Sequence, residues 1–442
     1  MPKFLMHPAR LVPMGFLLAM LIGALLLMLP AARAGEGHAP FLVALFTSTS
    51  AVCVTGLAVV DTATYWSTFG QAVIMGLFQV GGLGIMTGAT LLGFLISRHM
   101  SLSTRLLART EHVSAMGDVK STLKLVVAIT VLVELGMGMA LWLSLHFRYD
   151  ESWGMAAWHG FFLSVSAFNN AVFALYSDNL MSFVLDPFIN FPIIIAIVAG
   201  GIGFPVYLEL RRGWGQRTHW SVHAKLTLTG TAILLVLGTV AILLYEWNNV
   251  KTIGTFGLGG KLLAAFFHSV SARTAGFNSL DVGQMHTETL AVHYFLMYVG
   301  GGSAGTAGGV KITTMFLLAY TVWAEIRGET ETTLFGRKVS LDVQRQALTV
   351  VFLSTTIIAF ATLFILSICD FPLDVVVFEV ISAFATVGLS TGITAALPPA
   401  AQSTLILLMF VGRVGTVTVA TGLALRTKRT PYRYPEENPI VG

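Results

Sequence analysis

Long apolar stretches separated by short polar segments run through the whole chain. Eight of them are long enough to cross a membrane, which takes on the order of 20 residues, and they lie at 11–32, 70–96, 121–147, 188–210, 224–245, 290–324, 347–369 and 402–425. Four shorter apolar pieces lie between them, at 40–53, 155–168, 259–270 and 373–385. These pieces are too short to span a bilayer and have the length of re-entrant segments. The pattern predicts an all-α integral membrane protein with eight spans.

Composition leads to the same prediction. Of the 442 residues, 55% are hydrophobic and only 11% are charged, and the mean hydropathy is +0.78. A soluble domain has roughly a quarter of its residues charged, so a soluble protein is excluded. The two cysteines, Cys53 and Cys369, do not suggest a disulfide framework.

The first apolar stretch has two interpretations. Lys3 and Arg10 precede it and the small residues of 31–35 follow it, as in a cleavable signal peptide. The repeat described below requires a helix at this place, so we expect a retained first span.

Positive charge falls on alternate connections. Lys and Arg cluster at 97–124, 211–225 and 325–346 and in the C-terminal tail. The positive-inside rule therefore predicts that both termini are cytoplasmic. This topology accounts for the net charge of +4, so the charge does not indicate a nucleic-acid partner. The basic tail is suited to contact anionic membrane lipid.

One motif occurs four times. Each copy begins with a Phe and reaches a key position ten residues later, and the key positions are Gly56, Val172, Gly276 and Gly388, separated by 116, 104 and 112 residues. Each copy follows one of the short apolar pieces, so the unit is span, short helix, loop, span. The repeats divide the chain into 1–100, 101–215, 216–330 with a Gly-rich segment at 300–311, and 331–442 with the basic tail.

Four such loops can form an ion filter. Non-helical backbone at membrane depth is tolerated only where it is buried in protein or lines an aqueous cavity. Loops that meet on a pseudo-fourfold axis can offer carbonyl oxygens to a dehydrated cation, and Gly permits the positive φ that this requires. Small-residue helix packing is the other interpretation, and four matched copies argue against it. The predicted filter residues are Val54, Thr55, Gly56, Asn170, Ala171, Val172, Thr274, Ala275, Gly276, Thr386, Val387 and Gly388.

These loops resemble those of the Trk/Ktr/HKT potassium transporter superfamily, and most closely those of the membrane subunits of bacterial Ktr uptake systems, over nearly the whole chain. The resemblance implies channel-like K+ transport by a homodimer in the bacterial inner (plasma) membrane. It also implies control by a cytoplasmic ring of RCK-type nucleotide-binding subunits. The chain itself contains no phosphate-loop or ATP-binding motif, so we expect no nucleotide in it and no enzymatic activity.

A Gly-rich run interrupts the sixth apolar stretch. Each Gly costs roughly 1 kcal/mol relative to Ala in a helix, so this run cannot continue the span. In the family it forms an intramembrane gate beneath the filter; a simple hinge is the alternative. The predicted gate residues are Gly300, Gly301, Gly302, Ser303, Gly305, Gly308, Gly309, Lys311 and Arg413.

The predictions for the two cationic gate residues, Arg413 and Lys311, rest on different observations. Arg413 lies inside the last apolar stretch, where a charge usually faces a cavity or a partner. The family has an Arg here that points to the pore below the filter. Lys311 could act similarly, or it could cap the carbonyls of the broken helix.

The second loop departs from the family pattern, because Val172 stands where Gly is expected. Valine is β-branched and resists positive φ. Its carbonyl could face the ion if the residue kept a negative φ, and its side chain would then need room behind the filter. In the family a larger residue at a filter Gly goes with Na+ transport or reduced K+ selectivity, so Na+ is an alternative transported ion.

Three acids follow the filter positions: Asp61, Asp178 and Asp281. At an outer mouth they would raise the local cation concentration, whereas helix capping is the competing interpretation. A secondary transporter for an organic solute, built on broken helices, is a further alternative.

Overall fold

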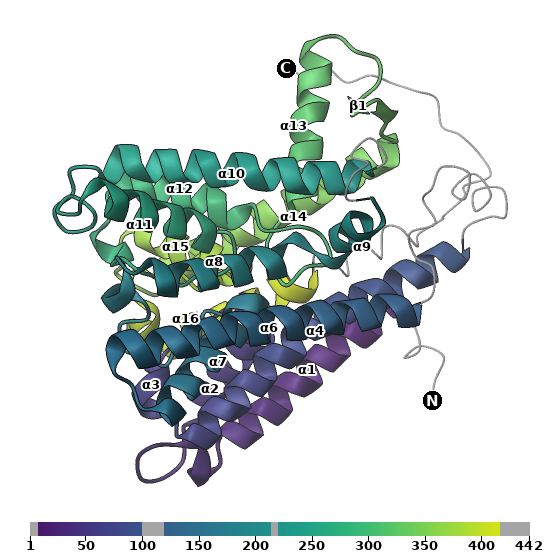
Figure 1. Cartoon of the computed structure of the whole chain (residues 1–442). Helices are drawn as coiled ribbons and strands as arrows, with labels where there is room; N and C mark the ends of the chain where they lie inside the picture. The colour runs from purple at the N-terminus through teal and green to yellow at the C-terminus, as the bar shows by residue number, and fades with distance from the viewer. Residues whose placement is uncertain (1–7, 100–118, 214–219, 416–442) are drawn as a thin grey trace.

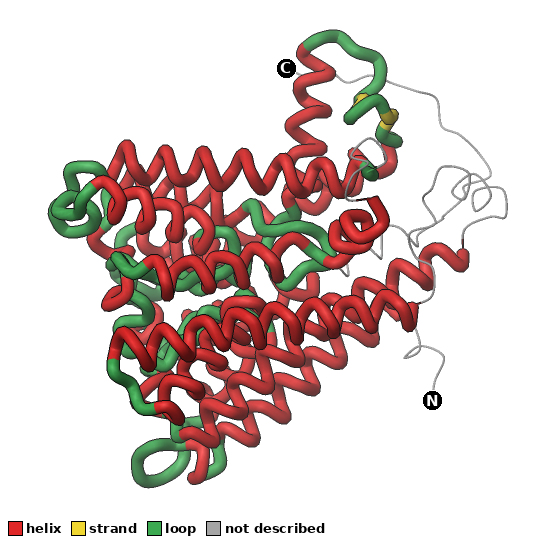
Figure 2. The backbone as a smooth tube through the Cα atoms, in the orientation of Figure 1, coloured by secondary structure: helices red, strands yellow, loops and turns green. Residues whose placement is uncertain are grey.

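The computed structural model describes residues 8–99, 119–213 and 220–415. These residues are mostly helical (Figure 2). The strands in this part of the chain are β1 (Thr333–Leu334) and β2 (Arg337–Lys338), an antiparallel hairpin in which Thr333 pairs with Lys338. The basic tail predicted to contact lipid, and the end of the eighth predicted span, lie outside the described residues.

Five long helices form the frame: α1 (Pro8–Leu27), α4 (Thr68–His99), α6 (Val119–Tyr149), α10 (Val222–Glu246) and α14 (Leu341–Leu366). In Figure 1, α1, α4 and α6 lie along one flank and α10 and α12 along the other, with α8 between them. Within the described residues, four helices are long and apolar enough to cross a membrane, or five when one bent pair counts as a span. Their outward faces carry exposed apolar side chains, such as Leu132 at 74% exposure. The molecule is thus a multi-pass membrane protein, and the count of eight spans stays a prediction.

Four short helices coincide with the four short apolar pieces. They are α2 (Phe41–Val52), α7 (Trp153–Asn169), α11 (Leu258–Ser271) and α15 (Leu373–Phe384), and their ends lie within two residues of the predicted limits. The C-terminal half of each is buried almost completely. Three of the four motif Phe residues are fully buried, whereas Phe266 is only partly buried and Phe267 occupies the buried place in that helix.

One predicted span is not straight. The apolar stretch 188–210 forms two helices, α8 (Pro187–Ile202) and α9 (Phe204–Gly213), which meet at an angle of 92°. The break lies at Gly203, whose φ is +91°. A continuous span was therefore the wrong expectation here, because a single Gly in an apolar run can end a helix without changing the hydropathy.

The sixth stretch is interrupted as predicted. Helix α12 (Thr287–Tyr298) ends and α13 (Ile312–Ile326) begins on either side of the Gly-rich run. The last described helix, α16 (Pro399–Phe410), continues into a π-helical turn, η6 (Val411–Gly415). The remaining short elements are α3 (Thr62–Tyr65), η1 (Pro30–Ala32), η2 (Met181–Phe183), η4 (Val282–Gln284) and η5 (Thr394–Ala396).

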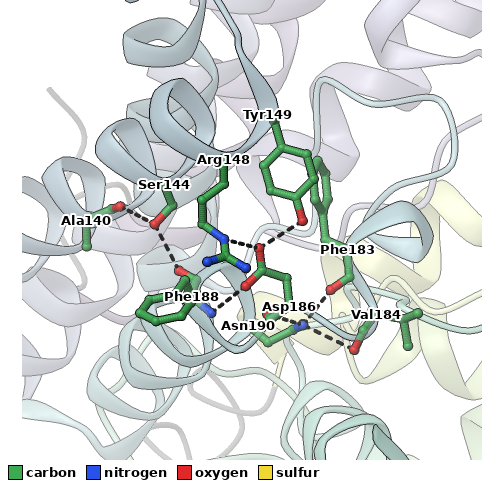
Figure 3. A network of polar contacts seen from close by, with 9 residues as sticks. All are labelled: Ala140, Ser144, Arg148, Tyr149, Phe183, Val184, Asp186, Phe188 and Asn190. Atoms are coloured by element: carbon green, nitrogen blue, oxygen red, sulfur yellow. Dashed lines mark hydrogen bonds and ion pairs between the residues drawn. The ribbon is translucent and has the colours of Figure 1, made fainter. Parts of the chain in front are cut away.

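A polar network fastens α6 to the start of α8 (Figure 3). Asp186 accepts hydrogen bonds from Arg148 Nε at 3.1 Å and from Tyr149 Oη at 2.8 Å, and it caps α8 by accepting from Phe188 N at 2.9 Å. Asn190 donates to the Phe183 carbonyl at 2.7 Å. Helix α7, which leads into the second loop, packs against both α6 and α8, so the network joins the two helices that contact it.

Candidate functional site

The four short helices end in loops with the same backbone pattern. In each loop, the key position and the residue two before it both have positive φ: Val54 and Gly56, Asn170 and Val172, Thr274 and Gly276, Thr386 and Gly388. Left- and right-handed conformations that alternate in this way turn successive carbonyls to one side of the chain. Four of these eight residues are neither Gly nor Asn, and the cost of their conformation, of order 1–3 kcal/mol each, is typical of functional sites.

The loops converge on one another. A Cβ on Gly56 would lie 2.5 Å from the carbonyl oxygen of Ala171 in the second loop. A Cβ on Gly276 would collide with the Val387 carbonyl, and one on Gly388 would collide with the Thr55 carbonyl. Each Gly therefore faces a carbonyl of another loop, and residues far apart in sequence form one cluster of backbone oxygens. The predicted filter residues are thus brought together.

Buried serines anchor three of these loops, and in the third loop Ser271 Oγ donates to the Phe277 carbonyl. Ser50 Oγ accepts a hydrogen bond from Gly56 N at 2.9 Å and donates to the Leu57 carbonyl at 2.7 Å. Ser382 Oγ accepts from Gly388 N at 3.1 Å. The serine at the same position of the second loop, Ser166, has no hydrogen-bond partner for its buried Oγ within the described residues. The second loop therefore differs from the others in more than its side chain.

Val172 does not keep the negative φ that a branched side chain prefers. Its φ is +70° rather than negative, so it follows the glycine pattern of the other loops despite its branched side chain. The side chain does not lie behind the filter either: Cγ2 lies near all three filter glycines. The condition considered in the sequence analysis, a negative φ with the side chain behind the filter, therefore does not apply, because the shared backbone pattern outweighs the local preference of one residue.

An open cavity of about 300 Å³ lies against the cluster, with Gly56, Val172, Asp61 and Asp178 in its lining. Asp61 caps α3 by accepting from Ala63 N at 3.0 Å; it also accepts from Ser177 Oγ at 2.6 Å. Asp178 accepts from Ser182 N at 2.9 Å. Both interpretations of these two acids are thus compatible with the structure.

Asp281 lies elsewhere. It caps η4 by accepting from Gly283 N at 3.0 Å, and it is not among the described residues that line this cavity. Its geometry is that of a capping residue.

The Gly-rich run forms a loop packed under the cluster. Gly302 N donates to the Gly201 carbonyl at 2.8 Å, and Thr306 N donates to the Gly200 carbonyl at 3.1 Å, both at the end of α8. Thr306 Oγ1 donates to the Phe168 carbonyl at 3.1 Å. A Cβ on Gly308 would lie 2.5 Å from the Ala385 carbonyl, so this Gly permits close contact with the fourth loop. The run therefore touches the second and fourth filter loops at once.

The two cations of this region bond to the run itself. Lys311 Nζ donates to the carbonyls of Ala307 at 2.6 Å and Gly308 at 3.3 Å, so it caps carbonyls of the broken helix. Arg413 is buried in η6 and donates from Nη1 to the Thr306 carbonyl. Its Nε and Nη2 have no hydrogen-bond partner in the part of the chain that the structure describes.

Two of the buried carboxyl groups, those of Glu134 and Glu379, belong to helices of the loop region. Glu134 accepts hydrogen bonds from Gln79 and Asn169, each at 3.2 Å. This agrees with the pairing between helices expected of a buried acid. Sequence reasoning did not single out Glu379, which is 1% exposed and accepts from Ser390 and from Thr394 Oγ1 beyond the fourth loop. The sequence does contain a signal for this residue, because Glu379 directly follows the motif Phe in an apolar helix, where a charge is unusual.

Comparisons with known proteins identify the family of the chain. The family model described as TrkH, cation transport protein, matches residues 5–429. The chain belongs to the TrkH family of cation transport proteins.

Characterised relatives match along almost their full length. The chain is 39% identical to the Ktr system potassium uptake protein B of Bacillus subtilis, over 98% of this chain and 97% of that protein. It is 37% identical to the Vibrio alginolyticus protein of the same name, over 98% and 94% of the two chains. It is 35% identical to the potassium/sodium uptake protein NtpJ of Enterococcus hirae, over 99% and 98%.

A solved structure shares the fold. The potassium transporter TrkH from Vibrio parahaemolyticus superposes with a TM-score of 0.73, covering 97% of this chain and 86% of that one, at 16% sequence identity. At this identity the likeness establishes the fold alone. The membrane-protein fold expected from the sequence is confirmed at this level.

Proposed function

We propose that the chain takes up K+ through a channel-like pathway across the bacterial inner membrane. The observation that carries this proposal is the cluster of four loops, in which alternating backbone conformations bring carbonyl oxygens of different loops together. Such oxygens replace the hydration shell of a monovalent cation. The relatives named as potassium uptake proteins support K+ as the ion.

The filter would be the residues 54–56, 170–172, 274–276 and 386–388, one from each of four repeats with eight spans in total and both termini in the cytoplasm. The broken pairs α8–α9 and α12–α13 would each count as one span. Inward movement of K+ would be driven by the membrane potential, which supplies about 2.3 kcal/mol per charge for each 100 mV. Asp61 and Asp178 would concentrate cations in the outer cavity.

The loop at 300–311 would act as the gate. It lies against two filter loops and receives a hydrogen bond from Arg413, so its displacement would open the path beneath the filter. Its described polar contacts are single hydrogen bonds, and one of them comes from the charged Arg413, so breaking a few of them would be enough to shift the loop.

Control would come from another chain. The chain's relatives belong to Ktr systems, and a system implies a second component. We infer that a cytoplasmic ring of RCK-type nucleotide-binding subunits docks on a homodimer of this chain. The projecting α13 and the β1–β2 hairpin, visible at one end of Figure 1, offer a docking surface on the proposed cytoplasmic side.

Na+ permeation is a second candidate. Val172 at a filter position and the potassium/sodium name of one relative favour it. Flux into vesicles that contain the purified chain separates the candidates, with K+, Rb+, Na+ and a neutral solute compared in parallel. We expect K+ and Rb+ flux well above Na+ flux. Equal Na+ flux would favour the second candidate, and solute flux without cation flux would reject both.

A further inference from the structure

The side chain of Val172 lies where the three filter glycines meet. A Cβ built on Gly56, Gly276 or Gly388 would lie 2.5, 2.6 or 2.5 Å, respectively, from Val172 Cγ2. The three glycines belong to three different loops, so one methyl group is close to all of them. Carbonyls of the surrounding loops meet at the same place. The methyl therefore occupies the centre of the cluster, where a cation would be coordinated.

The backbone of this residue holds the side chain there. With φ at +70°, the Cα–Cβ bond of Val172 has the direction in which a Cβ on the equivalent glycines would meet a neighbouring loop. The Val172 carbonyl accepts a long hydrogen bond of 3.4 Å from Asn179 Nδ2. Ser166, whose counterparts Ser50 and Ser382 bind the amide of their own filter glycine, leaves its Oγ without a partner in the described chain.

We propose that the Val172 side chain is a plug in the ion filter, and that it limits the rate of transport. A methyl group offers no lone pair to a dehydrated cation, and it occupies the space between the carbonyls in which the cation would be coordinated. For an ion to pass, the isopropyl group must leave the centre of the cluster. The cavity of about 300 Å³ that Val172 itself lines has room for it. This inference rests on the proposed function, since it assigns a role within that pathway.

The test compares graded truncations in the full-length chain, purified and reconstituted in vesicles. Initial Rb+ uptake and K+ uptake are measured under a fixed inside-negative potential for the wild type, Val172→Gly, Val172→Ala and Val172→Thr. The matched control is Val165→Ala, which removes the same two methyl groups from the helix that precedes the same loop. The K+ concentration that gives half-maximal thermal stabilisation is measured in parallel, because a merely structural role would not move it.

We expect Val172→Gly to transport at least about ten-fold faster than the wild type, which is about 1.4 kcal/mol of barrier. Val172→Ala should lie between the two, and Val165→Ala should stay within about two-fold of the wild type. Val172→Thr keeps the branched shape and should stay slow. Val172→Gly should also need less K+ for half-maximal stabilisation, because no methyl group then competes with K+ for the space between the carbonyls.

Two results would overturn the plug and leave K+ uptake intact. One is equal K+ flux in the wild type, Val172→Gly and Val172→Ala. The other is a Val172→Thr variant that transports K+ as fast as Val172→Gly, because the size of the side chain would then not be what limits transport. Absence of K+ flux in every variant, with all chains folded by thermal unfolding, would overturn the proposed function and the plug with it. If Val172→Gly does not fold, the comparison of Val172→Ala with Val165→Ala decides by the same criterion.

Discussion

Arg413 donates a hydrogen bond to the backbone carbonyl of Thr306. This contact joins the last described helical turn to the middle of the Gly-rich loop. Thr306 in turn donates from its hydroxyl to the Phe168 carbonyl at 3.1 Å and to Asn170 Oδ1 at 3.3 Å. One residue of the proposed gate is thus bound to η6 on one side and to the second filter loop on the other.

Replacing Arg413 should loosen the gate. A hydrogen bond from a charged group contributes about 1.5–3 kcal/mol, so Arg413→Gln should raise the resting Rb+ leak of vesicles roughly ten-fold. Arg413→Lys keeps a charged donor and should give a smaller increase. A leak that is unchanged in Arg413→Gln would show that this contact does not hold the loop closed.

The helix break at Gly203 should be essential. Its φ is +91°, and a Cβ there would collide with the Ser303 carbonyl of the Gly-rich loop. Gly203→Ala should therefore lower the free energy of unfolding by about 1–3 kcal/mol and alter gating. The matched control is Gly136→Ala in the interior of α6, where nothing lies within 4 Å of an added Cβ; it should stabilise by up to about 1 kcal/mol. Thermal unfolding in detergent measures both, and equal midpoints would contradict the argument.

Substitution of Ser50 and of Ser166, the serines at the same position of two filter loops, should have unequal effects. Ser50→Ala leaves Gly56 N and the Leu57 carbonyl without their side-chain partner, so it should destabilise by about 1–3 kcal/mol and reduce K+ over Na+ selectivity. Ser166→Ala removes a buried hydroxyl that has no partner among the described residues and should be neutral or stabilising. Thermal unfolding and paired K+ and Na+ fluxes report both effects. Equal losses in the two variants would mean that the two loops are anchored alike.

The acids of the outer cavity should act through long-range electrostatics. Neutralising Asp61 and Asp178 together, as Asn, should slow Rb+ uptake roughly three- to ten-fold at low ionic strength. The effect should fade in about 1 M salt, where the Debye length is about 3 Å. Asp281→Asn, away from the cavity, should change uptake by less than about two-fold. A loss that is independent of salt would identify Asp61 and Asp178 as capping residues only.

The helices of the pore region were predictable from the sequence because their signals are local. The four short apolar pieces and the Gly-rich interruption are visible as changes in hydropathy and Gly content. The key positions of the four loops were also predictable, because the same motif is repeated at each of them.

Two features could not be predicted, because they depend on contacts between distant segments. The break at Gly203 is hidden in a continuous apolar run, and the Gly-rich loop that packs closely against it comes from a distant part of the sequence. The direction of the Val172 side chain follows from three other loops rather than from its own preference for negative φ.

The most direct test of the central claim is Rb+ uptake into K+-loaded vesicles that contain only this chain. Outward K+ movement through the filter would make the interior negative and draw external Rb+ inward against its gradient. The account predicts Rb+ accumulation that external K+ abolishes and that protein-free vesicles lack. Rb+ uptake no greater than in protein-free vesicles, by a chain shown to be folded, would contradict it.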